Sequence, residues 1–71
     1  MEQNDLQRAL MAVLFAAGEP VAASRLAESL QVDESEIHRE CEALISALSY
    51  HRSGIRIVKL EDAYQIGRAH V

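Results

Sequence analysis

The stretch DESEIHRECEALISALS, Asp33 to Ser49, is the longest clearly amphipathic run of this 71-residue chain. Its apolar residues recur at intervals of three and four, which places them on one face of an α-helix. These residues are Ile37, Cys41, Leu44, Ile45 and Leu48. Asp33 with Glu36 has the form of a capping box, in which both side chains accept from N–H groups around the first turn. The sequence therefore predicts a helix that begins at Asp33 and buries one side.

The charges of this predicted helix argue against its use in reading DNA. If the preceding segments form a helix-turn-helix, it would be the recognition helix, whose first turns enter the major groove. Its acidic residues outnumber its one early basic residue, Arg39, so its surface would repel phosphate. The acidic residues are Asp33, Glu34, Glu36, Glu40 and Glu42. We expect these carboxylates to form a solvated face, on a DNA-binding type of fold that serves another purpose.

Length, charge and cysteine content limit the classes of protein to which the chain can belong. A chain this short buries only roughly 60% of its extended surface, so residues 1–71 should form one domain of marginal stability. The net charge is −4 and the pI about 5.2, whereas nucleic-acid modules typically have a basic patch and a high pI. With a single cysteine, no leader and no long apolar span, the sequence predicts a reducing, cytoplasmic location and no membrane partner.

The segment before Asp33 predicts two further helices. The first should be capped by Asn4, with Gln7 at the third position, and should end at Gly18 and Pro20. Its inward stripe comprises Leu6, Leu10, Val13, Leu14 and Ala17. A short second helix beginning near residues 22–24 then gives helix-turn-helix spacing.

The first helix is apolar around most of its circumference, because every residue from Ala9 to Ala17 is apolar. One interpretation is a central core helix with alanines on its outer side. The other is a self-association surface centred on Met11 and Phe15, since an exposed apolar patch usually marks an interface. The sequence leaves both interpretations open.

The C-terminal third predicts a β-hairpin. Gly54 precedes a strand over Ile55 to Leu60 that is rich in β-branched residues, and Glu61 and Asp62 suit a turn. The antiparallel partner is expected over Ala63 to Ile66. The predicted fold is thus of the α/β class and mostly α: a winged helix-turn-helix, in which a two-stranded hairpin wing follows three helices.

The two faces of the first predicted strand differ. Ile55 and Ile57 should pack on the helices, whereas Val58 and Leu60 on the other face are our second choice for a dimer interface. Four cations on or near the wing and the second helix could touch DNA phosphates, the alternative function being that of a winged-helix transcription regulator. These cations are Arg25, Arg52, Arg56 and Lys59.

No catalytic or metal-binding constellation can be assembled from the sequence. Cys41 shares a face with Ile37 and Leu44, where a thiol behaves as a small hydrophobe of the core. His38 and Cys41 could share a helix face as metal ligands, but two further convergent ligands are lacking. No Gly-rich phosphate loop or nucleophile elbow occurs, so we predict no enzyme, no cofactor and no metal.

Four segments resemble a known family: LFAAGEPV (14–21), LAESL (26–30), GIRIV (54–58) and AYQ (63–65). Together they are similar to the N-terminal winged helix of segregation and condensation protein B, the kleisin-interacting partner of the bacterial SMC complex. The resemblance implies a non-enzymatic subunit, associated with the nucleoid through the SMC complex, that forms homodimers through this domain. It further implies that the kleisin, segregation and condensation protein A, is held mainly by a second winged helix, which residues 1–71 do not include.

Three sites, which comprise four residues, depart from the family pattern. Ala22 stands where a Ser or Thr cap is frequent, Gln31 where Gly is frequent, and Glu61 and Asp62 where Gly-Gly is frequent near the wing tip. A lost cap costs about 1 kcal/mol, and a non-Gly residue at positive φ costs a similar amount. These departures concern local stability rather than family.

The last six residues, IGRAHV (66–71), match what a common sequencing-library adapter encodes in one reading frame. We therefore expect the natural gene to continue beyond about Gln65; a genuine short tail is the alternative. No function is assigned to Arg68 or His70.

Overall fold

The structure of the chain is a computed structural model that describes residues 3–50 and 54–68. Its elements are, in order, α1 (Gln3–Ala17), β1 (Val21–Ala22), α2 (Ala23–Leu30), α3 (Glu34–Tyr50), β2 (Ile55–Leu60) and β3 (Ala63–Arg68). Three helices followed by a hairpin confirm the predicted winged helix-turn-helix.

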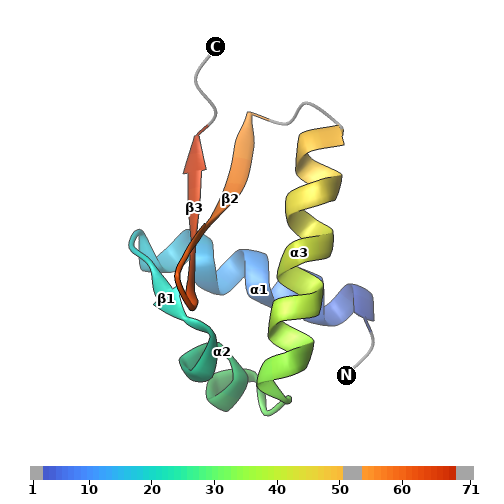
Figure 1. Ribbon diagram of the computed structural model, residues 1–71, viewed down its shortest axis with the longest axis vertical. Helices are drawn as coiled ribbons and strands as arrows, with labels where there is room; N and C mark the ends of the chain where they lie inside the picture. The colour runs from blue at the N-terminus through green and yellow to red at the C-terminus, as the bar shows by residue number, and fades with distance from the viewer. Residues whose placement is uncertain (1–2, 51–53, 69–71) are drawn as a thin grey trace.

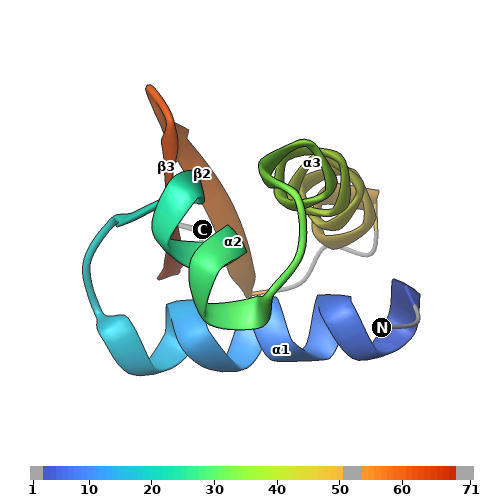
Figure 2. The same ribbon diagram turned by 90° about the horizontal axis from the view of Figure 1, so that it is seen from below.

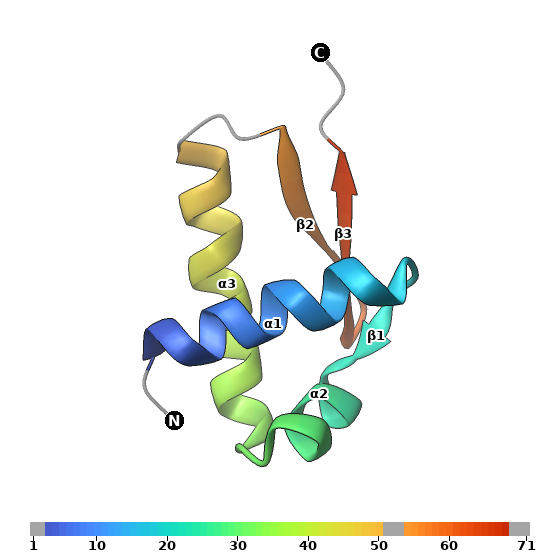
Figure 3. The ribbon, with the colours of Figure 1, turned by 180° about the vertical axis from the view of Figure 1, so that it is seen from behind.

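The helix α1 lies along one side of the molecule, and all the other elements lie on its other side (Figure 2). The helix α3 and the β2–β3 hairpin stand next to each other and cross α1, while α2 lies near the N-terminal end of α3 (Figures 1 and 3). One long side of α1 therefore faces no other helix or strand of the described residues.

The core draws on every helix and on the hairpin, because each contributes the residues of one face. The three-and-four spacing of the helices and the alternation of the strands bring these side chains together. The buried apolar residues are Leu6, Leu10, Leu14, Ala23, Leu26, Ile37, Cys41, Leu44, Ile57 and Tyr64. The prediction that Cys41 is a core residue is confirmed.

The start of α1 differs from the prediction. The helix already includes Gln3, so Asn4 lies in its first turn and is not the cap. The amide of Gln7 donates a hydrogen bond of 2.9 Å to Oε1 of Glu40 on α3, instead of supporting a capping box. A contact between two helices thus takes the place of the predicted local one.

The start of α3 also uses different atoms from those predicted. Asp33 does precede the helix, but its backbone carbonyl is the acceptor, for the N–H groups of Glu36 at 3.0 Å and Ile37 at 3.2 Å. Within the described residues, no hydrogen bond joins the two carboxylates of the expected capping box to this end of the helix.

The sheet has three strands in the order β1-β3-β2, all antiparallel. The two-residue β1 pairs Val21 with Tyr64, an edge strand that the sequence did not predict. β3 continues to Arg68, beyond the predicted end at Ile66, and pairs Ile66 with Ile57. The last strand of the chain therefore lies in the middle of the sheet.

Two tight turns hold the hairpin and the helix-turn-helix in place. Gln31, which ends α2, and Glu61, in the β2–β3 turn, have φ values of 58° and 57° in the left-handed region. Ala22 makes no side-chain cap, as expected, but the N–H of Ala23 donates a 2.7 Å hydrogen bond to the carbonyl of Asp62. A backbone bond from the wing turn thus satisfies one donor at the start of α2.

Candidate interaction surface

The outward side of α1 carries a large apolar side chain in an exposed position. Phe15 is 66% exposed, while its neighbour Leu14 is buried. Ala12 and Ala16 are also exposed, so alanines do cover much of this side, as one of the two interpretations expected. An exposed phenylalanine is not explained by that interpretation, because it leaves a large apolar area in water.

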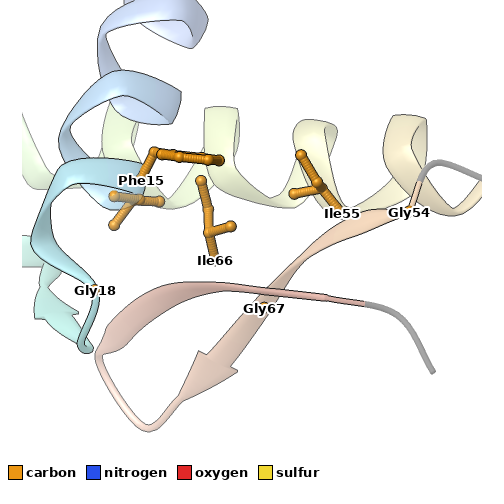
Figure 4. A pocket seen from close by; sticks show the side chains of 7 residues that line it. Phe15, Gly18, Gly54, Ile55, Ile66 and Gly67 are labelled. Atoms are coloured by element: carbon orange, nitrogen blue, oxygen red, sulfur yellow. The ribbon is translucent and has the colours of Figure 1, made fainter.

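Phe15 lies at the edge of an apolar hollow of about 430 Å³ between the end of α1 and the hairpin. Ile55 on β2 and Ile66 on β3 face α1 across this space (Figure 4). The residues that line the hollow are Leu14, Phe15, Gly18, Gly54, Ile55, Ile66 and Gly67, which include no charged side chain.

Met11, one turn before Phe15, is half-buried and packs against the core. It lines a second hollow, between α1 and α3, together with Leu44. Because residues four apart share a helix face, Met11 and Phe15 form one apolar strip along α1. We call this strip, with the hollow beside Phe15, the α1 surface.

Val58 and Leu60 lie on a different surface. Ile57, the residue before Val58, is buried against the helices, so the alternation of the strand turns Val58 and Leu60 away from α1. Leu60 is 46% exposed and Val58 is half-buried. The structure thus divides the four residues predicted for the dimer interface into two separate pairs.

The acidic residues of α3 are largely solvated, but Glu36 is half-buried and Glu40 is buried. Asp33, Glu34 and Glu42 are exposed as predicted, but Glu40 is only 3% exposed. Its carboxylate accepts from Gln7, and its Oε2 lies 3.6 Å from Nε of the exposed Arg39. The expectation that every carboxylate of α3 faces solvent is wrong at Glu40, which lies on the face between Ile37 and Leu44.

His38 joins α3 to the wing. Its Nδ1 lies 2.7 Å from the hydroxyl of Tyr64, and its Nε2 lies 3.7 Å from Oε1 of Glu34. Cys41, which could share a metal with it, lies in the core. Among residues 3–50 and 54–68, no group of three potential ligands is placed to hold a metal ion.

Burial also sets the acidity of two groups in the core. It raises the pKa of the Cys41 thiol to about 12, with a smaller effect of the charges of Glu42 and Glu40. Burial likewise raises the pKa of Tyr64 to about 12, with smaller effects of Cys41 and neighbouring carboxylates. A thiol this weakly acidic is a poor nucleophile, because the thiolate is the reactive form.

The cations proposed for phosphate contact do not share a face in the described part of the chain. Arg25 is exposed on α2, and Arg56 is exposed on the outer face of β2. Lys59 lies on the opposite face of that strand, with Nζ 3.7 Å from Oε1 of Glu42. Arg52 falls outside the described residues.

The fold is a winged helix whose surface combines an acidic α3 with an exposed apolar strip. That combination is typical of a member of this class that binds protein rather than DNA. No helix in the described ranges is long and apolar enough to cross a bilayer.

The family model described as segregation and condensation complex subunit ScpB matches residues 8–70. The chain belongs to this family, as its resemblance predicted. Segregation and condensation protein B of Alkaliphilus metalliredigens is 30% identical over 66 residues, and that of Alkaliphilus oremlandii 32%. These matches cover 93% of the chain but 35% and 36% of the relatives, so the chain spans about a third of their length.

Two solved structures are similar. ScpB from Mycobacterium tuberculosis matches with a TM-score of 0.92 at 20% identity, over 97% of this chain and 43% of that one. A second structure is described as a dimer of ScpB N-terminal domain complexed with ScpA peptide. It matches with a TM-score of 0.85 at 27% identity, over 93% of this chain and 83% of that one. The chain thus has the fold of an ScpB N-terminal domain.

Proposed function

We propose that the chain is a non-enzymatic dimerisation and adaptor module of a bacterial SMC–kleisin complex for chromosome segregation and condensation. Two copies meet through the α1 surface, centred on Met11 and Phe15. The outer face of the wing, with Val58 and Leu60, is the second choice for this contact.

The exposed ring of Phe15 carries the proposal. A side chain of this size, 66% exposed beside an apolar hollow, leaves a patch in water that a partner surface would cover. The similar structure described as a dimer of ScpB N-terminal domain supports a second copy as that partner.

The kleisin subunit, segregation and condensation protein A, is the proposed second partner. The similar structure is described as containing a ScpA peptide together with N-terminal domains. The family resemblance alone implies that a second winged helix makes most of the contact with the kleisin. Overlapping fluorescent peptides of the kleisin, titrated into the purified chain, would test this part by anisotropy. Binding by none of the peptides would exclude the domain as a kleisin site.

The dimer is tested by measuring the mass of the purified chain by light scattering over a range of concentrations. The wild-type chain should form dimers, and Phe15→Glu should form folded monomers, because the new carboxylate would be buried without a partner. Circular dichroism should show unchanged helix, since Phe15 is not a core residue.

Leu60→Glu is the matched control, because Leu60 is also a large exposed apolar residue but lies on the outer face of the wing. It should leave the dimer intact. A monomer from Leu60→Glu with an intact Phe15→Glu dimer would move the interface to the wing. A wild-type chain that is monomeric throughout would refute self-association, and tight DNA binding at physiological salt would favour the regulator function instead.

A further inference from the structure

Phe15 projects from a rigid part of the molecule. It belongs to the last turn of α1, and Leu14 beside it is buried in the core. The packing of the helix therefore fixes the position of the Phe15 backbone, which does not belong to a loop. A large side chain held in this way is suited to act as an anchor in a partner surface.

The hollow beside Phe15 is large enough to receive such a ring. Its volume is about 430 Å³, whereas an apolar cavity of about 150 Å³ already holds a benzene molecule. A Cβ placed on Gly18 or Gly54 would meet no atom within 4 Å, so the space along this rim is open. The lining residues carry no charge that would have to be desolvated.

The projecting ring and the hollow adjoin each other on one face, where Phe15 forms part of the wall (Figure 4). A two-fold dimer requires a patch that is complementary to itself, so that a residue of each copy meets the same site on the other. If one patch carries both a projection and a hollow, the projection of each copy can enter the hollow of the other, so the same contact forms twice in one dimer.

We propose that the dimer forms by reciprocal insertion, in which Phe15 of each copy fills the hollow of the other copy. This inference rests on the proposed function, since it describes how the α1 surface self-associates. It assigns the hollow to a second copy of the chain, and not to a peptide of another protein.

Two variants separate the projection from the hollow. Phe15→Ala removes the ring, and Gly54→Phe fills the hollow at a position that has no positive φ and has open space for a side chain. Each variant alone should weaken the dimer by more than about 30-fold, the effect typical of a central aromatic anchor. Gly54→Leu serves as a smaller filler if Gly54→Phe loses its helical circular dichroism.

Mixing the two variants is the decisive step. The chain with Phe15→Ala keeps an open hollow that has lost one wall residue, and the chain with Gly54→Phe keeps its Phe15, so one insertion is restored in a mixed dimer. On the other side of that dimer, the filled hollow faces the truncated side chain without a clash. Native mass spectrometry of the mixture, with one chain isotopically labelled, should show mixed dimers in excess over either homodimer.

The outcomes distinguish this inference from the proposed function. Variants that dimerise as tightly as the wild-type chain, or weakened variants that form no mixed dimer, would overturn reciprocal insertion while dimerisation itself stands. If Phe15→Ala abolishes the binding of a kleisin peptide but leaves the dimer unchanged, the peptide and not a second copy occupies the hollow. A wild-type chain that never dimerises would overturn the proposed function as well.

Discussion

Glycine at the two left-handed positions should stabilise the domain. Gln31 and Glu61 have φ values of 58° and 57°, where a residue with a Cβ costs roughly 1–2 kcal/mol. Glycine removes this cost. It also raises the conformational entropy of the unfolded chain, which lowers the free energy of unfolding by about 0.4–1 kcal/mol. The net gain at each site is therefore between about 0 and 1.6 kcal/mol, with a midpoint of about 0.8 kcal/mol.

We expect the two gains to add, because Gln31 lies between α2 and α3 and Glu61 lies in the hairpin turn, which are separate turns of the chain. The double variant Gln31→Gly, Glu61→Gly should gain roughly 1–2 kcal/mol in the free energy of unfolding. For a domain of this size each kcal/mol raises Tm by about 4–8 °C.

Urea and thermal unfolding followed by circular dichroism measure this gain, at one protein concentration for all variants because dimerisation shifts apparent stability. Gln31→Ala and Glu61→Ala are the controls, since alanine loses the same side-chain atoms but keeps the backbone cost. Equal stability of the glycine and alanine variants would refute the reasoning, as it would assign the effect to the side chains.

Three further results are expected. The unfolding free energy should fall by roughly 1.4 kcal/mol per pH unit above about pH 9, where the unfolded chain loses the Cys41 proton that the folded chain keeps up to about pH 12. The slope should steepen above about pH 10 as Tyr64 contributes, and the part that begins near pH 9 should vanish in Cys41→Ala. Gln7→Leu should cost about 1–3 kcal/mol, because the buried Glu40 loses its 2.9 Å donor; the same change in a Glu40→Met background should cost much less. Equal costs in both backgrounds would mean that the two side chains are not coupled.

The helices were predictable because their periodic patterns are long. The run from Asp33 to Ser49 defined α3 to within one residue at each end, and the stripe of α1 identified three of its core leucines. The strand β1 was missed, because two residues carry no periodicity and the strand exists only through its pairing with β3. Local patterns therefore determine the long elements, and tertiary pairing determines the short one.

The polar details were less predictable. The burial of Glu40 had a signal in the sequence, since it lies three residues after Ile37 and four before Leu44 on the apolar face of α3. Its partner Gln7 is 33 residues away, and no local pattern predicts such a contact. The exposure of Phe15 also follows from tertiary packing, because its residue type alone suits a core position equally well.

The middle position of β3 affects how the domain can form during synthesis. The strand that both edges of the sheet need follows all three helices in the chain, so it emerges from the ribosome after them. Until then Val21 has no strand to pair with, and the N–H of Ala23 lacks its acceptor in the wing turn. Part of the apolar surface of the nascent helices therefore stays exposed to water at first. The sheet forms only when the residues up to Arg68 emerge.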